Sequence, residues 1–292
     1  MFRSGPAFGG VNLVNQPWRE NYHQAEITNV YPLSATDKLY QIRIVDPQAR
    51  QEFAFHAGQF VMLELPGIGE APFSISSSPL RRGEVELCIR KVGNLTRFLD
   101  RVERGVKVGI SGPYGSHFPV EDMAGADVLF VAGGLGLVPL RSPLNAVLEN
   151  RSRYGRVDLV YGNRTPAELL FTYQYQEWRQ FDVDLGIIVD HPDDSWTGPV
   201  GLITAQLAEH LAGRFLAENS YAIVCGPPVM FKYVCDLLTS AGLPMQRMFV
   251  SLERRMHCGR GICCRCNIGS TYVCLSGPVF DYWSVMNLKE AI

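Results

Sequence analysis

The sequence predicts an antiparallel β-barrel, a doubly wound parallel α/β domain and a small cysteine-rich module, in that order along the chain. Three observations lead to this prediction. From residue 24 to about residue 112, short alternating or apolar segments are separated by turn residues, as in antiparallel barrels. After Asp122, apolar segments alternate with helical patterns, which is typical of a parallel sheet covered by helices. Five of the eight cysteines fall within the last 35 residues.

Length and composition limit the classes of protein to which the chain can belong. Its 292 residues suffice for two domains and a small third module. Lys and Arg total 27 against 29 Asp and Glu, so the net charge of −2 gives no basic footprint for nucleic acid or an anionic membrane. The longest uncharged apolar run, residues 128–140, is too short to cross a bilayer, and the first residues lack a secretory signal. We therefore expect a cytoplasmic protein with no transmembrane segment and with reduced cysteines.

The N-terminal part of the chain contains the predicted barrel. Residues 1–22 are rich in Gly, Asn and Pro and show no periodicity, so we expect an irregular arm there. Residues 23–122 form the barrel domain, with strands expected at 41–45, 60–65, 85–90 and 106–111. Turn residues separate these strands, as they do in antiparallel barrels.

The predicted α/β domain covers residues 123–246. Strands are expected at 128–132, 157–161, 183–189 and 221–225, with a last one at 248–252 that leads into the cysteine-rich module, residues 247–292. The first helix has apolar residues at i, i+4, i+7 and i+8, namely Leu140, Leu144, Val147 and Leu148. Residues 165–168 combine a capping box with a proline at the first helical position, which predicts a helix start. Further helices are expected from about residue 204 and around residues 230–238.

Four cysteines have the spacing C-x4-C-x2-C-x7-C, whose first three members match the plant-type [2Fe–2S] ligand pattern. They are Cys258, Cys263, Cys266 and Cys274. Each iron of such a centre takes two protein thiolates, and Gly259, Gly261 and Gly269 would let backbone amides approach the sulfurs. A zinc site with four cysteines is the alternative, although zinc sites more often show two C-x2-C pairs. Cys264 is expected to be a buried spare thiol, and Cys88, Cys225 and Cys235 to be core residues.

A glycine-rich turn follows the first parallel strand and opens a helix. Gly133, Gly134 and Gly136 permit the backbone to approach a pyrophosphate closely, and the N-terminus of the helix favours an anion. Pro139 replaces the last glycine of the usual dinucleotide fingerprint. An ordinary structural turn is therefore an alternative interpretation of this segment.

Other strand ends carry turns that could complete a nucleotide site, because ligands of open α/β sheets bind beyond the carboxyl ends of the strands. The candidate residues are Asn163, Arg164, Asp190, Cys225, Gly226 and Pro227. The Asp190 carboxylate could accept hydrogen bonds from ribose hydroxyls and repel a 2′-phosphate, whereas Arg164 could attract that phosphate. We therefore expect NAD(H), with NADP(H) as the alternative.

Taken in order, several motifs resemble those of the ferredoxin–NADP reductase superfamily, over about residues 24–281. Similar to its Greek-key flavin-binding barrel are His56-Ala57-Gly58-Gln59-Phe60, Pro72-Phe73-Ser74-Ile75-Ser76, Arg90-Lys91-Val92-Gly93-Asn94-Leu95-Thr96 and Gly112-Pro113-Tyr114-Gly115. The glycine turn and Cys225-Gly226-Pro227 resemble its nicotinamide domain. The four-cysteine tail, which ends in Gly277-Pro278-Val279-Phe280, resembles the branch with a C-terminal cluster, and residues 69–79 look closest to hydrogenase gamma subunits.

The resemblance implies an FAD site in the barrel. Phe73, Ser74 and Ile75 would line the isoalloxazine ring beside Pro72, unless Phe73 and Ile75 are only barrel core. Val92, Gly93 and Thr96 would present donors to the FAD pyrophosphate at a helix start. Many relatives carry Arg directly before the Pro-Phe-Ser run, where this chain has Ala71. Arg90 or Lys91 would then supply the cation, or backbone donors would bind most of the phosphate.

The resemblance also implies a function. The branch includes electron-transfer subunits of dihydroorotate dehydrogenase and of anaerobic sulfite reductase, and gamma subunits of NAD(P)-linked [NiFe] hydrogenases. We expect a diaphorase subunit that moves electrons between NAD(P)H and a catalytic redox subunit through FAD and a [2Fe–2S] cluster, in a hetero-oligomer with further iron–sulfur subunits. No side chain is expected to act as a general acid or base, because the cofactors carry the chemistry. A zinc-stabilised, non-catalytic scaffold subunit is the alternative from another class.

Overall fold

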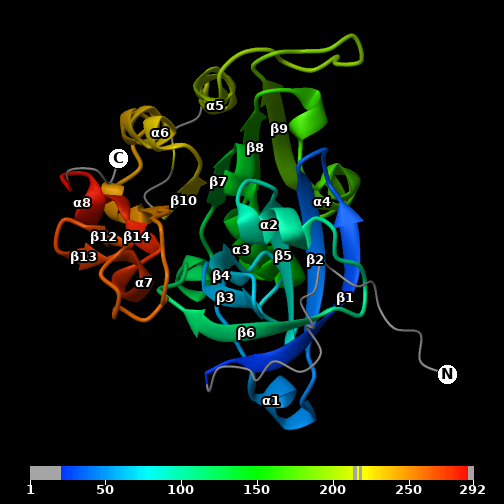
Figure 1. Ribbon diagram of the computed structural model, residues 1–292. Helices are drawn as coiled ribbons and strands as arrows, with labels where there is room; N and C mark the ends of the chain where they lie inside the picture. The colour runs from blue at the N-terminus through cyan, green and yellow to red at the C-terminus, as the bar shows by residue number, and fades with distance from the viewer. Residues whose placement is uncertain (1–20, 213–215, 217–218, 289–292) are drawn as a thin grey trace.

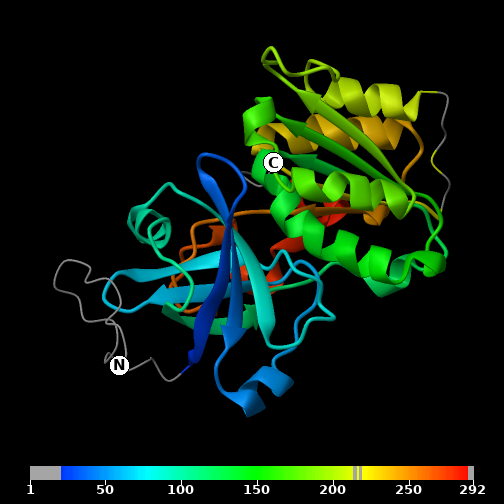
Figure 2. The same cartoon turned by 90° about the vertical axis from the view of Figure 1, so that its right-hand side faces the viewer.

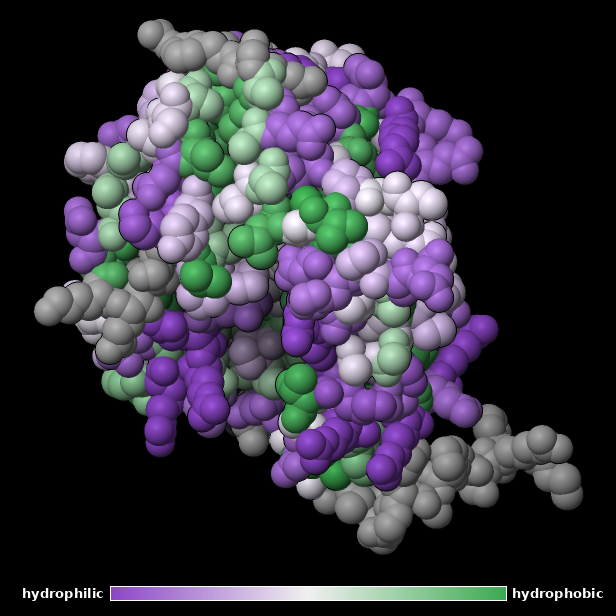
Figure 3. Space-filling view, turned by 90° about the horizontal axis from the view of Figure 1, so that it is seen from above, coloured by the Kyte–Doolittle hydropathy of each residue, from purple (hydrophilic) through white to green (hydrophobic). Residues whose placement is uncertain are grey.

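The structure, a computed structural model, describes residues 21–212, 216 and 219–288. It contains the three units that the sequence predicts, in the predicted order (Figure 1). The expected N-terminal arm lies almost wholly outside the described residues. Within those residues no helix is both long and apolar enough to span a membrane. Polar and apolar side chains are mixed on the face that Figure 3 shows.

The first unit is an antiparallel sheet of six strands in the order β4-β3-β6-β1-β2-β5. The strands are β1 His23–Pro32, β2 Asp37–Ile44, β3 Phe60–Leu65, β4 Gly69–Ser74, β5 Glu84–Arg90 and β6 Lys107–Tyr114. β4 and β5, at the two ends of this order, contact each other, so the sheet curls into a barrel around buried Ile42, Leu63 and Leu87. Two short helices, α1 Pro47–Glu52 and α2 Asn94–Leu99, complete the unit.

The second unit is a six-stranded sheet in the order β14-β11-β10-β7-β8-β9. Five strands are parallel, namely β7 Val128–Gly133, β8 Val157–Asn163, β9 Val183–Val189, β10 Tyr221–Cys225 and β11 Met248–Ser251. Residues of α3 Leu137–Glu149 and α4 Tyr175–Gln180 pack on one face of the sheet. Residues of α5 Ile203–Leu211 and α6 Pro228–Ser240 pack on the other, as a doubly wound fold requires.

The third unit carries the cysteines and joins the other two. It contains the hairpin β12 Asn267–Ile268 and β13 Thr271–Tyr272, the short helices α7 Val273–Ser276 and α8 Tyr282–Val285, and β14 Val279–Asp281. β14 adds antiparallel to β11 at the edge of the parallel sheet. Ser116, just after β6, donates its amide to Gly277 O at 2.6 Å and its hydroxyl to Val279 O at 2.6 Å. The orange and red C-terminal segment therefore runs between the two larger units (Figure 2).

One predicted helix is absent. Residues 165–168 form only a 3₁₀ turn, Pro166–Glu168, and α4 begins at Tyr175. The side-chain amide of Asn163 donates to Glu168 O at 2.6 Å, and the amide of Leu170 donates to the Tyr161 hydroxyl at 3.2 Å. These hydrogen bonds hold Glu168 and Leu170 against the end of β8, so they override the local capping signal.

Candidate functional site: two adjoining cavities and a cysteine cluster

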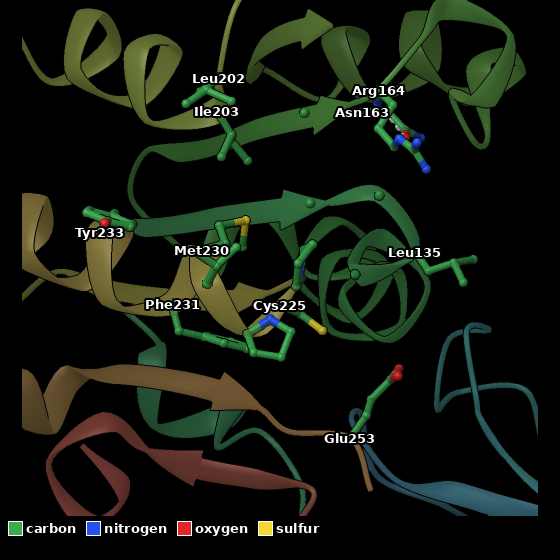
Figure 4. Close-up of a pocket in the computed structure, with 18 of the residues that line it drawn as sticks. Leu135, Asn163, Arg164, Leu202, Ile203, Cys225, Met230, Phe231, Tyr233 and Glu253 are labelled. Carbon is green, nitrogen blue, oxygen red and sulfur yellow. Dashed lines mark hydrogen bonds between the residues drawn. The ribbon is translucent and has the colours of Figure 1, made fainter. Parts of the chain in front are cut away.

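A cavity of about 830 Å³ lies at the carboxyl ends of β7, β8, β9 and β10 (Figure 4). The structure brings all the residues that the sequence predicts for a nicotinamide dinucleotide to its wall, namely Gly133, Gly134, Gly136, Asn163, Arg164, Asp190, Cys225, Gly226 and Pro227. Sheet topology explains this gathering, because parallel strands present their carboxyl ends at one edge.

Two of these glycine-rich turns pack directly against each other. A Cβ on Gly136 would lie 2.1 Å from the carbonyl oxygen of Cys225, and a Cβ on Gly226 would lie 3.2 Å from the Cα of Gly133. Gly134 differs, because it has φ +55° and its Cβ position is open except for Asn163 Oδ1 at 3.9 Å. Gly133, Gly136 and Gly226 thus hold the two turns together, and Gly134 exposes backbone to the cavity.

The two residues expected to contact the ribose, Arg164 and Asp190, both line this cavity. The amide of Asp190 donates to Asn163 O at 3.0 Å, and the amide of His191 donates to Arg164 O at 2.8 Å. These backbone bonds hold Asp190 and Arg164 side by side, and both line the cavity. The side-chain amide of Asn163 already has hydrogen-bond partners within the protein. Its Nδ2 also donates to the Tyr161 hydroxyl, and its Oδ1 accepts from the Arg164 amide.

A second cavity, of about 240 Å³, lies between the barrel and the C-terminal module. Six of the residues predicted for FAD line it, namely Pro72, Phe73, Ser74, Arg90, Val92 and Thr96. Three others are not part of its wall. Ile75 is fully buried in the barrel core, Lys91 pairs with Asp100 at 2.8 Å, and Gly93 precedes α2.

The start of α2 is capped by its own threonine. The amides of Val92 and Gly93 donate to Thr96 Oγ1 at 2.9 and 2.8 Å. The two amides are thus paired within this turn, as in a capping box.

Arg90 lines both cavities and is held in place by a buried carboxylate. Its Nε and Nη2 donate to the two oxygens of Asp37 at 2.8 and 3.0 Å, and Asp37 is fully buried. Burial alone raises the pKa of Asp37, but hydrogen bonds from Arg90 and Ser34 and the Arg90 charge outweigh it and lower that pKa. The pair is therefore ionised, and the bidentate geometry fixes the guanidinium where both cavities meet.

The two cavities share one wall, formed by Arg90, Leu135, Leu252, Glu253 and Arg254. Sequence reasoning missed Glu253 and Arg254. Their position one residue beyond the end of β11, at the carboxyl edge of the sheet, is the signal that could have found them. Glu253 reaches into the cavity opposite Asn163 and Arg164 (Figure 4), and desolvation by the surrounding protein raises the pKa of its carboxyl.

Cys225 lies at this cavity but is not set up as a nucleophile. Its Sγ donates to Ser251 O at 3.6 Å, and its side chain is almost fully buried. Burial raises the pKa of the thiol far above its ordinary value, so it stays protonated. Cys88 also has a pKa raised by burial, and it lines the second cavity rather than serving only as core.

The four predicted metal ligands form two pairs, with Cys274 in α7 and the other three in the loop before β12. Cys258 is hydrogen-bonded to Cys263, and Cys274 to Cys266, through their side chains. Backbone amides of Arg260, Ile262 and Cys263 point at Cys258 Sγ from 3.3 to 3.4 Å, the Gly261 amide lies 3.1 Å from Cys274 Sγ, and the Cys274 amide lies 3.4 Å from Cys266 Sγ.

This donor set fits an anionic thiolate cluster. Burial raises the pKa of Cys258, but the three amides outweigh it and lower that pKa to about 7, whereas burial and the hydrogen bond to Cys266 raise the pKa of Cys274 to about 12. Gly259, Gly261 and Gly269 all have positive φ, which lets the backbone wrap the sulfurs. Two thiolate pairs with amide donors suit a cluster of two irons.

The remaining cysteine of the loop is not buried, contrary to expectation. Cys264 is exposed, with φ +56°, and its Sγ accepts from the Tyr272 hydroxyl at 3.2 Å. The left-handed backbone turns this residue away from its two ligand neighbours. Adjacent cysteines rarely ligate one centre together, and in this loop the extra thiol is exposed.

The cysteine loop adjoins the second cavity. Cys266 and Cys274 belong to the same buried cluster as Phe60 and Met62 of β3. Phe60, together with Met256 and Pro278 of the C-terminal unit, lines the second cavity. The first cavity, the second cavity and the cysteine cluster thus follow one another through the molecule.

This fold and site define a flavoprotein reductase that uses a nicotinamide dinucleotide and carries an iron–sulfur module. Residues 24–118 match the oxidoreductase FAD-binding domain, and residues 130–236 match the oxidoreductase NAD-binding domain. Residues 253–286 match the iron–sulfur cluster binding domain of dihydroorotate dehydrogenase B.

Similar proteins narrow the class to a family. Sulfhydrogenase 1 subunit gamma of Pyrococcus furiosus is 37% identical over 91% of this chain and 92% of its own length. Sulfhydrogenase 2 subunit gamma of the same organism is 36% identical over 94% and 99%. A probable dihydroorotate dehydrogenase B electron transfer subunit of Methanocaldococcus jannaschii is 33% identical over 79% and 80%. The chain belongs to this family of oxidoreductase subunits, which carry electrons between NAD(P)H and a partner through FAD and an iron–sulfur cluster.

Solved structures agree with the fold. An NADH-dependent reduced ferredoxin-NADP oxidoreductase aligns with TM-score 0.68 at 23% identity, over 91% of this chain and 90% of its own. A ferredoxin NADP⁺ reductase from Neisseria gonorrhoeae aligns with TM-score 0.66 at 19% identity, over 80% and 98%. At these identities the likeness concerns the fold alone.

Proposed function

We propose that this chain is the diaphorase subunit of an [NiFe] hydrogenase complex and exchanges electrons between NAD(H) and the catalytic subunits. The observation that carries the proposal is the order of the sites within one chain. The nucleotide cavity shares a wall with the second cavity, and the second cavity adjoins the cysteine cluster. Such an order suits a relay from a hydride donor to a one-electron acceptor.

In this proposal the protein binds and orients the cofactors, and the cofactors supply the redox chemistry. When bound, FAD would supply the acceptor for a hydride from the nicotinamide and the donor of single electrons to a [2Fe–2S] cluster. Gly134 and the start of α3 would receive the dinucleotide pyrophosphate, and Asp190 its ribose. Phe73 and Ser74 would line the flavin ring, and Arg90 would stand beside both cofactors. Cys258, Cys263, Cys266 and Cys274 would hold the two irons.

The proposal of a hydrogenase partner rests on end-to-end similarity. The two sulfhydrogenase gamma subunits match over more than nine-tenths of this chain, whereas the matching dihydroorotate dehydrogenase subunits cover 79–82% of it. Further iron–sulfur subunits of the same complex would accept the electrons. An electron-transfer subunit of dihydroorotate dehydrogenase or of anaerobic sulfite reductase is the second candidate.

The test is to purify the complex that contains this chain anaerobically from its native cells and to assay it with NAD⁺ or NADP⁺. The proposal expects pyridine-nucleotide reduction driven by H₂. Reduction of the nucleotide driven only by dihydroorotate, or NADH-driven reduction of sulfite without hydrogenase activity, would instead favour the second candidate function. Mass spectrometry of the complex identifies the partner independently of activity.

A spectrum of the purified chain separates a redox subunit from a zinc-stabilised scaffold. The redox proposal expects bound flavin and iron–sulfur absorbance that NADH bleaches, with two irons per chain. One zinc per chain and a colourless protein would overturn it. Titration of the same sample with NADH and then with NADPH also shows which of the two nucleotides reduces the flavin more readily.

A further inference from the structure

The loop that carries the cysteines is strongly basic in a chain that is otherwise acidic. Residues 254–280 contain four arginines and no Asp or Glu, so their formal charge is +4. The chain as a whole has 27 basic and 29 acidic residues, which leaves 23 basic and 29 acidic residues, or −6, outside this segment. Glu253 and Asp281 flank this segment, and a thiolate cluster is itself anionic, so both offset part of this charge; the field that a charged partner meets there depends on the arginines that are exposed.

The four sulfurs are unequally buried, so the site has one open side. Cys266 and Cys274 are each only 2% exposed, whereas Cys258 and Cys263 are half-buried. Ile262 lies between the two half-buried ligands and is 69% exposed. Electrons that leave the cluster toward another protein therefore have their shortest way out beside Ile262.

A second exposed apolar side chain adjoins Ile262. Leu275 follows the ligand Cys274 and is 56% exposed. A Cβ on Gly261 would lie 2.4 Å from the side chain of Leu275, so Leu275 packs against the backbone beside Ile262. Two exposed apolar side chains in contact with a ligand loop suit the centre of a small interface.

Arginines flank these apolar side chains. Arg255, Arg260 and Arg265 are all exposed, and none forms an ion pair with any residue in the described part of the chain. Arg260 lies between Cys258 and Ile262, and Arg265 directly precedes Cys266. The exit face is defined here by Arg260, Ile262, Arg265 and Leu275. In Figure 1, α7 and β13 lie at the outer edge of the molecule, where a partner has access.

We propose that the exit face is the docking surface for the electron-exchanging partner, and that the partner presents an acidic rim around an apolar centre close to its own redox group. This inference rests on the proposed function and specifies the chemistry of the partner. An apolar centre with a charged rim matches the anatomy of protein interfaces, in which complementary rim charges favour the correct partner and speed association. The electrons balance, because oxidation of one NADH releases one proton and reduces two equivalents of a one-electron protein.

The test uses the full chain loaded with FAD and its cluster, and two one-electron proteins of opposite charge. A plant-type ferredoxin serves as the acidic probe and cytochrome c as the basic probe. Binding is measured by calorimetry at low salt with both proteins oxidised, so that no electron moves. We expect the chain to bind ferredoxin at least tenfold more tightly than cytochrome c, with an affinity that falls as salt rises.

Charge reversal provides the decisive comparison. Arg260→Glu/Arg265→Glu should weaken ferredoxin binding about tenfold or more and flatten its salt dependence. The matched control is Arg101→Glu/Arg104→Glu, an equal charge change at two exposed arginines just before the Lys107 end of β6, the end opposite to Gly115 and the cysteine module. Ile262→Asn should weaken ferredoxin binding without altering its salt dependence.

Several outcomes would overturn the inference. One is that the unaltered chain binds cytochrome c as tightly as ferredoxin, or binds neither. Another is that the charge-reversed variant binds ferredoxin normally while the reduction potential of its cluster shifts. The arginines would then tune that potential and would not contact a partner. Bleaching of the flavin by NADH is measured in every variant as well. If NADH fails to bleach the flavin in the unaltered chain, the proposed function is wrong, whereas normal bleaching with altered binding bears only on the docking surface.

Discussion

Arg141 of α3 donates to the carboxylate of Glu86 in β5 at 2.5 Å, across the boundary between the nucleotide domain and the barrel. Both side chains are less than a tenth exposed. Arg141 also donates to Ser76 O at 3.0 Å and to Gln174 Oε1 at 2.7 Å, and its guanidinium lies over the Phe171 ring at 4.7 Å. The two domains that hold the two halves of the site are thus joined by a buried ion pair.

Arg141→Ala should destabilise the protein by about 3–5 kcal/mol, because it leaves the buried Glu86 charge without its main partner. Thermal or denaturant unfolding of the flavin-loaded chain measures this loss. Arg81→Ala is the matched control, since Arg81 contacts the same carboxylate from a position that is 56% exposed. Its effect should stay below about 1 kcal/mol. Equal losses from both variants would contradict the importance of the buried pair.

The same carboxylate predicts a pH dependence. Burial raises the pKa of Glu86, but the charge and hydrogen bonds of Arg141, Gln41 and Arg81 outweigh it and hold that pKa below 4.5. A carboxyl with a lowered pKa stabilises the fold fully above pH 4.5, and its contribution is lost as the pH falls through the folded-state pKa. The stability difference between the unaltered chain and Glu86→Gln should therefore be constant near neutral pH and shrink below pH 4.5.

Arg90 rather than Lys91 should support FAD binding, because only Arg90 lines the second cavity. Arg90→Ala combined with Asp37→Asn, which avoids an unpaired buried carboxylate, should weaken FAD binding about tenfold, as expected for the loss of one charged hydrogen bond. Lys91→Ala should leave the dissociation constant nearly unchanged. Fluorescence titration of the flavin-free chain measures both, and the opposite ranking of the two variants would refute the assignment.

Asp190 and Arg164 should act in opposite directions on nucleotide choice. Asp190→Ala should lower the preference for NADH over NADPH by removing a ribose acceptor and a charge that repels the 2′-phosphate. Arg164→Ala should raise that preference. The ratio of kcat/KM for the two nucleotides, measured with a one-electron dye, reports the change. An unaltered ratio in both variants would mean that neither residue meets the ribose.

Cys263 and Cys264 offer a pair of neighbouring thiols with contrasting predicted roles. Cys263→Ser should remove the cluster absorbance and electron delivery to one-electron proteins while some NADH-driven flavin reduction persists. Cys264→Ser should keep the cluster, because Cys264 faces solvent. Iron content and the visible spectrum of the two variants decide the matter. Full cluster absorbance in Cys263→Ser would remove Cys263 from the ligand set.

Much of the site was accessible from the sequence because it consists of short, local motifs. The cysteine spacing, the glycine turn after β7 and the Cys225-Gly226-Pro227 turn each place backbone groups within a few residues of one another. The α/β strands near 128, 157, 183 and 221 were found for the same reason. By contrast, the sequence pattern does not separately predict β1 and β4 of the barrel, and the helix expected at residues 165–168 is displaced by hydrogen bonds from the Tyr161 and Asn163 side chains.

The sequence by itself determined the order of the three units, the four cysteines and the turns at the strand ends, since these depend on residues close together in the chain. The tertiary structure alone decided that Arg90 and not Lys91 enters the cavities, that Glu253 and Arg254 form their shared wall, and that Arg141 reaches Glu86. Those relationships join residues tens of positions apart. They depend on how the two domains pack, and no local pattern encodes that packing.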